Sequence, residues 1–400
     1  MKPLRCLAIT VTLALVSVGP DPSDARGVTI DMVTVGDPGN ANDTTGYGAV
    51  GYAYQIGTYE VTIGQYADFL NAVAASDPNG LYFPDMGTDQ SVAGIARSGS
   101  SGSYAYVAIG PSGTTPAGAS SAGGRPIAYV SWFNAARFAN WLSNGQPTGP
   151  QGPTTTENGA YDLSLWLLGI APAANATNPN TGAAPLYRLP TENEWYKSAY
   201  YKAGGTDAGY WDYATQSDTA PGNTIGGAAY QANYALGGVI FSVPQSASFG
   251  QDQNLLTDAG AFSGSPSGYQ TFDQSGNVYE WNDLAGIAGF TRGLRGGNFA
   301  SDETTIAATA RGELDPLQPL GGFRLVSSVM GPAAIPEIDT HGLAAALALI
   351  GGGLGVLERR RHGRQAGRGE GVRGAASPLP HSAGGSNRGA DTVDPAASSS

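Results

Sequence analysis

The side chains available for chemistry in the central part of this 400-residue sequence are carboxylates, amides, hydroxyls and guanidinium groups. Between Arg26 and Gly331 there is neither a histidine nor a cysteine. These residue types cannot build Ser-His-Asp or Cys-His nucleophile pairs, or the usual ligand sets of zinc, copper and non-haem iron. Oxygen-rich side chains suit hard cations such as calcium instead.

Charge divides along the sequence. Residues 26–331 hold 11 Lys and Arg against 24 Asp and Glu, a balance of −13, whereas residues 358–400 hold 7 Arg against 4 acids. The acidic region argues against nucleic acid as a partner, because it would repel the phosphate backbone. It is compatible with an extracellular, cation-rich setting.

The first 25 residues have the pattern of a secretory signal peptide. Lys2 and Arg5 precede an apolar run over 6–18 that is too short to span a bilayer, and small residues at 23–25 offer a cleavage site. The only cysteine, Cys6, lies within this segment. We therefore expect an exported mature protein without disulfides or thiol chemistry.

The fold is expected from residues 26–331, which are rich in Gly, Pro and short aromatic segments and show no internal repeat. The elements that must position any site are few. Periodic apolar residues predict helices over 62–74 and 134–143, and a capping box at Thr191 to Glu194 predicts a third. Strands are expected at 52–59, 127–132 and 322–326. Long loops over 95–125 and 145–182 are expected to be functional or to be insertions.

Ordered motifs give a resemblance to a known family. The motifs, in chain order, are Tyr59-Glu60-Val61-Thr62, the segment 125–132, Tyr187-Arg188-Leu189-Pro190-Thr191-Glu192-Asn193-Glu194-Trp195, Gly276-Asn277-Val278-Tyr279-Glu280-Trp281, the segment 294–299, Arg311 and Gly322-Phe323-Arg324. Together they resemble the sulfatase-modifying-factor domain of formylglycine-generating enzymes over residues 45–328. The resemblance implies an α+β fold, a loop-rich variant of the C-type lectin fold with few helices and short antiparallel strands. Independently of it, Arg324 is expected to pair with a buried carboxylate such as Glu192 or Glu280.

The resemblance also implies where the family's copper site would lie. Two cysteines that follow the Gly-Gly pair bind copper in the family and oxidise a substrate cysteine, and those positions here hold Ser301 and Ile306. Neither side chain can hold copper as a thiolate does. We therefore expect no copper and no formylglycine generation.

The calcium sites that the resemblance implies are better preserved. The first would use the Asp273 and Glu280 side chains with the carbonyls of Gly276 and Val278. The second would use Asn233, the Tyr234 carbonyl, Asp252 and the Asn254 carbonyl. Carboxylates and carbonyls at a glycine turn fit the six to eight oxygen ligands of calcium. The alternative for Asp273 and Glu280 is helix capping and hydrogen bonding in the core without metal.

The C-terminal region changes in composition. Residues 332–341 are expected to be a linker, 342–357 an uncharged apolar run, and 358–400 an arginine-containing tail that is disordered. The apolar run is slightly short for a membrane span, but the arginines after it match the positive-inside pattern.

This C-terminal arrangement resembles the PEP-CTERM class of sorting signals, with Pro336-Glu337 before the apolar run and Arg359 to Arg361 after it. The resemblance implies transport to the cell surface or extracellular matrix of a Gram-negative-type bacterium. The long extension after the arginines departs from the class. A simple membrane anchor with a cytoplasmic tail is the alternative.

Three functions remain open at this point. The first is a non-catalytic binding or structural domain whose loops contact a polysaccharide or a surface protein. The second is an enzyme with chemistry unlike the cysteine oxidases, carried by Asp302, Glu303 and Arg311. The third is a scaffold that presents variable loops for ligand diversity, which a single sequence does not distinguish from the first.

Overall fold

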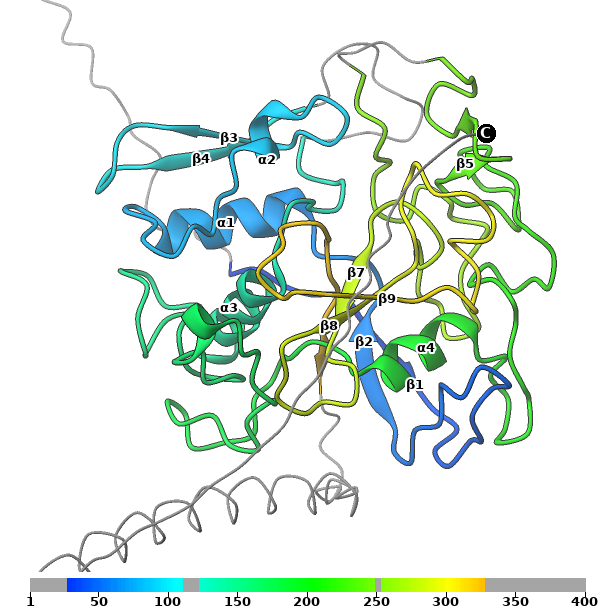
Figure 1. Ribbon diagram of the computed structural model, residues 1–400, viewed down its shortest axis with the longest axis horizontal. Coiled ribbons are helices and arrows are strands. Elements are labelled where there is room, and N and C mark those ends of the chain that lie inside the picture. The colour runs from blue at the N-terminus through cyan, green and yellow to red at the C-terminus, as the bar shows by residue number, and fades with distance from the viewer. Residues whose placement is uncertain (1–26, 111–121, 249–252, 328–400) are drawn as a thin grey trace, which may run out of the picture. The chain divides into compact units, whose positions relative to one another are not determined.

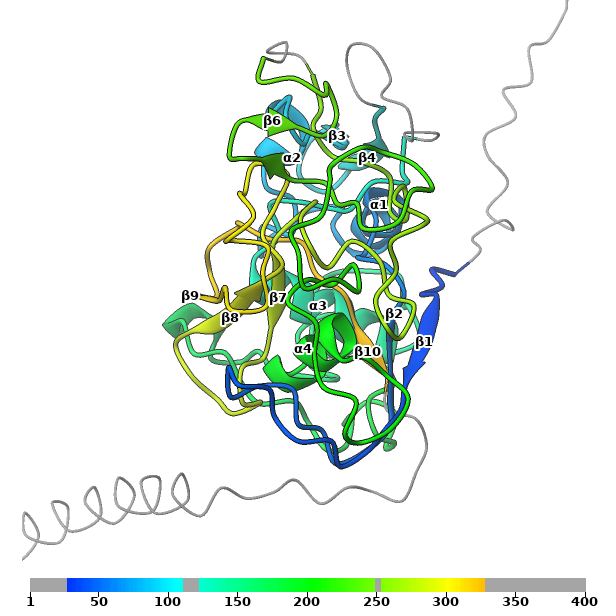
Figure 2. The same cartoon turned by 90° about the vertical axis from the view of Figure 1, so that its right-hand side faces the viewer.

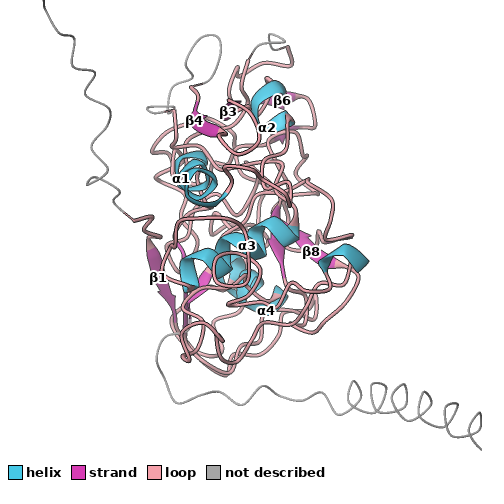
Figure 3. Ribbon diagram, turned by 90° about the vertical axis from the view of Figure 1, so that its left-hand side faces the viewer, coloured by secondary structure: helices cyan, strands magenta, loops and turns pink. Residues whose placement is uncertain are grey.

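A computed structural model describes residues 27–110, 122–248 and 253–327 (Figure 1). The signal peptide, linker, apolar run and tail expected from the sequence lie outside the described residues. Within the part that is described, no helix is both long and apolar enough to cross a membrane. Loops connect short helices and strands throughout (Figure 3).

Four α-helices and ten strands make up the described secondary structure. The helices are α1 (Ile63–Val73), α2 (Asp85–Thr88), α3 (Trp132–Ser143) and α4 (Glu192–Tyr200), with a 3-10 turn η2 at Trp166–Leu168. The strands are β1 (Met32–Val35), β2 (Tyr54–Gly57), β3 (Ile95–Ser98), β4 (Ala105–Ala108), β5 (Ala235–Leu236), β6 (Ile240–Phe241), β7 (Glu280–Asn282), β8 (Arg292–Arg295), β9 (Gly312–Leu314) and β10 (Val326–Ser327).

The strands form small antiparallel sheets. β2 lies between β1 and β10, so the last described strand returns to the first ones, as Figure 2 shows. β8 lies between β7 and β9, with Trp281 opposite Leu294 and Leu294 opposite Gly312. The hairpins β3–β4 and β5–β6 complete the set.

Two of the helices, α1 and α4, begin at the capping residues that the sequence predicts. The hydroxyl of Thr62 caps α1 and that of Thr191 caps α4, and Gln65 and Glu194 return hydrogen bonds to complete two capping boxes. These reciprocal bonds satisfy backbone N–H groups that the first turn of a helix leaves unpaired.

The main core lies between α1, α3 and the motif strands. Phe69 of α1 packs edge-on against Phe138 of α3, with ring centroids 5.3 Å apart, and Phe138 packs against Phe323 at 5.5 Å. Trp281 is fully buried, and its indole N–H donates to the Val130 carbonyl at 2.8 Å. The segments that carry the motifs therefore build the core.

Three local predictions are wrong. Within residues 127–131 only Val130 forms an isolated bridge, because Ser131 caps α3 and Trp132 already belongs to that helix. Of the strand expected at 322–326, only Val326 belongs to a strand, β10, whereas Gly322 forms an isolated bridge to Glu280. The segment 95–125 is not loop throughout, because β3 and β4 pair within it and β4 contacts α1 (Figure 1).

One pH-dependent prediction arises in α4. Lys197 is buried, its Nζ donates to the Asp37 carbonyl at 2.8 Å, and burial lowers the pKa of Lys197 to about 8. The unfolded chain holds this proton up to an ordinary lysine pKa of about 10.4, so it binds more protons than the folded state above about pH 8. We expect the free energy of unfolding to rise with pH from about 8 to 9.5, with no contribution to the slope below that range.

Urea denaturation across this pH range measures the effect, with Lys197→Met as the comparison. The variant should lack the rise that the wild type shows. A rise of equal size in both proteins would contradict the assignment to Lys197.

Candidate functional site

Ser301 and Ile306, the two positions that the resemblance assigns to copper-binding cysteines, lie side by side. A Cβ at Gly297 would approach Ile306 Cγ2 to 2.7 Å and Ser301 Oγ to 3.1 Å, so both side chains flank this glycine. Ile306 is fully buried and packs with Ala232 and Tyr234. The Ser301 hydroxyl accepts the N–H of Asn298 at 2.9 Å. These contacts use the two side chains for packing and for closing a turn.

The acids next to this position do not converge on a reaction centre. Asp302 is partly exposed, and hydrogen bonds from Thr305 and Thr304 hold its pKa below the ordinary value. Glu303 accepts the N–H of Gly237 at 2.6 Å. Asp302 closes a local turn, Glu303 bonds to the turn between β5 and β6, and Arg311 pairs with other carboxylates.

The residues expected to form the first calcium set lie around a buried ion pair. Glu280 is fully buried and accepts hydrogen bonds from Arg324 Nε and Nη2, at 2.6 and 2.7 Å, and from the Trp195 indole at 2.8 Å. Asp273 Oδ2 accepts the N–H of Gly260 at 2.6 Å, and burial raises the pKa of Asp273 to about 6.

This set fits calcium poorly as arranged, because a guanidinium already neutralises one of its two carboxylates. Arg324 thus pairs with Glu280, one of the two partners expected for it, and not with Glu192. A second acid, Glu60, lies near the same guanidinium, with Oε2 3.9 Å from Arg324 Nη2. Burial raises the pKa of Glu60 well above its ordinary value, and no hydrogen bond to its carboxylate is present among the described residues.

The second calcium set contains one acceptor that fits a cation. Asn233 is buried, and its amide nitrogen donates to Leu255 O at 3.1 Å and Asn277 Oδ1 at 3.0 Å. Its Oδ1 is buried without a hydrogen-bond partner among the described residues. Buried acceptors are normally paired, so this oxygen is available to a cation or a water molecule.

The other members of the second set contribute less. The Tyr234 carbonyl accepts from Ser242 Oγ at 3.2 Å, and the side chain of Asn254, whose backbone carbonyl was the expected ligand, accepts the N–H of Leu256 at 3.1 Å. Asp252 lies outside the described residues. Among the residues that are described, no group of three or more His, Cys, Asp and Glu side chains is arranged to hold a metal. Calcium at Asn233 would therefore depend on amide and carbonyl oxygens.

A calcium titration tests this set. We expect millimolar calcium to raise the melting temperature of the protein, because a ligand that binds only the native state stabilises it. In Asn233→Ala the calcium-dependent rise in melting temperature should be absent, whatever the substitution itself does to stability. Asp162→Ala, which replaces an exposed acid, should keep this rise. An increment that survives in Asn233→Ala would contradict the assignment.

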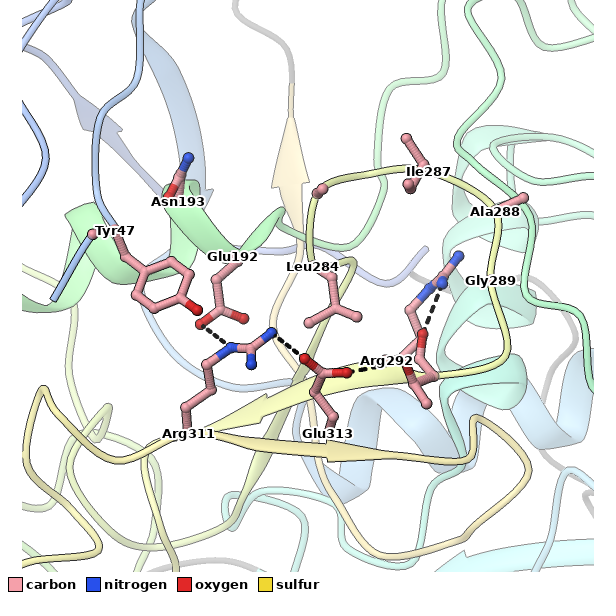
Figure 4. A pocket seen from close by; sticks show the side chains of 13 residues that line it. Tyr47, Glu192, Asn193, Leu284, Ile287, Ala288, Gly289, Arg292, Arg311 and Glu313 are labelled. Atoms are coloured by element: carbon pink, nitrogen blue, oxygen red, sulfur yellow. Dashed lines mark hydrogen bonds and ion pairs between the residues drawn. The ribbon is translucent and has the colours of Figure 1, made fainter. Parts of the chain in front are cut away.

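A cavity lies on another part of the molecule. Its volume is about 420 Å³, and four segments line it: the loop at 46–47, the first turn of α4, the loop 284–292, and the Arg311 and Glu313 side chains around β9. Neither Ser301 nor Ile306 lines it. Figure 4 shows Leu284 across from the charged side chains.

The charged groups of the cavity form a chain of ion pairs. Arg311 Nη2 lies 2.6 Å from Glu313 Oε1, and Arg311 Nε lies 3.5 Å from Glu192 Oε1 (Figure 4). Glu192 also pairs with Arg295 of β8 behind the cavity. The side chain of Glu192 is only 5% exposed, and its second oxygen has no hydrogen-bond partner among the described residues.

This arrangement suits binding better than proton transfer. The guanidinium of Arg311 holds the pKa of Glu313 below its ordinary value, so this carboxylate stays ionised at neutral pH. A general acid or base needs a pKa near the working pH. The cavity instead offers fixed charges, an unpaired buried acceptor on Glu192 and an aliphatic wall.

Sequence reasoning singled out Arg311 but did not predict the cavity. A local signal existed in the loop after Trp281, where the apolar residues Leu284, Ile287 and Phe290 stand in a glycine- and alanine-rich segment. Apolar side chains in a surface loop are a recognised mark of an interaction site.

One family model matches this chain over most of its length. The profile of the sulfatase-modifying factor enzyme 1-like domain matches residues 40–329. A search of curated proteins found no match. Among solved structures, the chain is similar to CarF, with 21% identity and a TM-score of 0.40, covering 75% of this chain and 99% of CarF.

Two further solved structures are similar to the chain. Treponema denticola variable protein 1 shows 19% identity and a TM-score of 0.40, over 76% of this chain and 96% of that protein. PvdO from Pseudomonas aeruginosa shows 16% identity and a TM-score of 0.35, over 75% and 92% of the two chains.

Proposed function

Because the chain belongs to the family of the sulfatase-modifying factor enzyme 1-like domain, whose profile spans residues 40–329, we propose that it is a non-catalytic binding member of that family. Its loop-rich α+β fold with few helices is the one expected of the family. The ligand would occupy the cavity bounded by α4, the loop 284–292 and β9.

One observation carries this proposal. The two positions that the family resemblance assigns to copper ligands are occupied by a buried isoleucine and by a serine that closes a turn, while a cavity of about 420 Å³ lies elsewhere in the described structure. Thiolates are the ligands that select copper(I), and neither residue provides one.

The second candidate, an enzyme with non-cysteine chemistry, has less support. It requires Asp302, Glu303 and Arg311 to act together. Asp302 and Glu303 each bond to a neighbouring turn, whereas Arg311 bonds to Glu313 and Glu192 at the cavity. Arg311 lowers the pKa of Glu313, an acid that lines the cavity.

We further propose that the domain works outside the cytoplasm, at the surface or in the extracellular matrix of a Gram-negative-type bacterium. The signal-peptide pattern over 1–25 and the apolar run over 342–357 support export and membrane attachment before any processing. Calcium, a surface protein and a polysaccharide are the partners consistent with an acidic exported domain.

The experiment measures copper(I) affinity and oxidation of a cysteine-containing peptide under air, with the full chain and with Ser301→Cys/Ile306→Cys. We expect the wild type to bind no copper(I) tightly and to leave the peptide mass unchanged. The double variant should gain tight copper(I) binding, because the two positions flank Gly297. Copper(I) binding by the double variant would show that the assay detects a copper site at these positions, so that its absence in the wild type has a clear meaning.

Peptide oxidation by the wild type that requires copper would overturn the proposal. Failure of the double variant to bind copper(I), in a protein that still melts cooperatively, would contradict the assignment of the two positions.

A further inference from the structure

An exposed apolar surface adjoins the cavity. Six large side chains in three loops are between 50% and 76% exposed, and we call them the apolar face: Leu165, Leu167, Leu168, Ile287, Phe290 and Leu320. Single exposed apolar residues are ordinary, but a group of them on one surface is typical of an interaction site.

The three loops form one continuous surface. Ala171 and Gly289 exchange two backbone hydrogen bonds of 2.9 Å, which join the loop of Leu168 to that of Ile287 and Phe290. Leu317 Cδ1 lies 3.9 Å from the place of a Cβ on Gly169, which brings the third loop against the first. Ile287 also lines the cavity, so the cavity opens at the edge of the apolar face (Figure 4).

The face is supported from beneath but is not part of the core. Trp166, in the same 3-10 turn as Leu167 and Leu168, packs edge-on against Phe133 at 6.3 Å and lies over the Arg137 guanidinium at 4.5 Å. Because Trp166 fixes the turn, the neighbouring leucines are held outward in solvent. A fixed apolar surface loses less conformational entropy on binding than a mobile one does.

The charges around the face are mainly negative. Asp162, Glu313 and Asp315 are exposed next to its loops, while the cation Arg311 is 27% exposed and already paired with Glu313. A second copy of this chain would bring like charges together, and so would an anionic membrane. A partner with a basic rim would instead complement these charges.

We propose that the apolar face docks a protein partner that presents aliphatic side chains bordered by lysine or arginine, with one side chain entering the cavity toward the free oxygen of Glu192. The proposal rests on the binding function proposed above and names its partner. Five of the six side chains are aliphatic, which suits the core of a protein interface. A polysaccharide would be better served by open aromatic rings.

Short synthetic peptides test the chemistry against the full chain. One alternates leucine and lysine, a second replaces lysine by glutamate, and a third replaces leucine by serine. Binding is measured by fluorescence anisotropy for the wild type and for Leu167→Ser/Phe290→Ser. The matched control is Val107→Ser/Val239→Ser, which removes two apolar side chains that are also more than half exposed, at 61% and 55%, in other parts of the chain.

We expect the leucine–lysine peptide to bind the wild type and the control with equal affinity. Its affinity for Leu167→Ser/Phe290→Ser should be lower by at least about tenfold. The leucine–glutamate and serine–lysine peptides should bind at least about tenfold more weakly than the leucine–lysine peptide. Unchanged melting temperatures would show that the substitutions leave the fold intact.

Three results would overturn the proposal. The first is equal binding of the leucine–lysine peptide by all variants, which would reflect net charge alone. The second is binding of a neutral glucan oligosaccharide that Leu167→Ser/Phe290→Ser abolishes, which would assign the face to polysaccharide. The third is a dimer of the wild type that the same substitutions dissociate. The copper and peptide-oxidation assay is independent of all three, so the proposed function can stand when this inference fails.

Discussion

Replacing Arg324 by methionine is expected to lower the free energy of unfolding by about 3–5 kcal/mol. Arg324 is fully buried, donates twice to Glu280, and also donates to the carbonyls of Phe272 and Gly57 at 2.8 and 3.0 Å. Without the guanidinium, the Glu280 carboxylate would remain buried and unpaired, and its desolvation would no longer be offset.

Urea denaturation with Arg311→Met as the matched control measures this effect. Arg311 pairs with Glu313 at the surface, so its replacement should cost no more than about 1 kcal/mol. The double variant Arg324→Met/Glu280→Gln should recover part of the loss, because it removes the unpaired charge. Equal, small effects of the two arginine replacements would contradict a structural role for the buried pair.

The second large effect is expected for Gly276→Ala. Gly276 has a φ of +94°, and a Cβ there would lie 2.1 Å from the carbonyl oxygen of Asn233. Alanine would thus combine backbone strain with a clash that breaks the bridge between these two segments. We expect a loss of about 3 kcal/mol or more, since each such strained residue alone costs about 1–3 kcal/mol.

Gly80→Ala is the control that separates strain from clash. Gly80 has a φ of +64°, but nothing lies within 4 Å of the place of its Cβ. Its replacement should cost only the strain of a left-handed alanine, about 1–2 kcal/mol. Similar losses for the two alanine variants would mean that the segment of Asn233 moves freely, and the orphaned oxygen of Asn233 would then lose its significance.

The features predicted correctly from the sequence are those set by neighbours in the chain. The starts of α1 and α4 follow from hydrogen bonds between residues three apart, so Thr62 and Thr191 identify them directly. The ordered motifs identified the family, because its core is built from those same segments. The start of α3 was placed two residues late, since the cap at Ser131 follows an apolar run that resembles a strand.

Features that depend on distant segments were predicted less well. The sequence does not distinguish Glu192 from Glu280 as the partner of Arg324, because Glu280 lies 44 residues away in the sequence. The cavity was missed because it combines Tyr47, Glu192, Leu284 and Arg311 from segments that only the fold brings together. The sequence does not predict the apolar face either, since the loops that carry Leu167 and Phe290 are joined only through the bridge between Ala171 and Gly289.

Where this chain binds its ligand is the central question, and hydroxyl-radical footprinting of the full chain with and without the leucine–lysine peptide answers it most directly. We predict that the peptide protects Leu167, Phe290 and Leu320, which belong to the apolar face beside the cavity, and leaves Leu236 reactive. Leu236 lies beside the former copper position, where the Ala235 N–H donates to the Ser301 carbonyl at 2.9 Å. Protection of Leu236 with continued oxidation of Leu167 and Phe290 would contradict the account and return the binding site to the place of the family's lost copper centre.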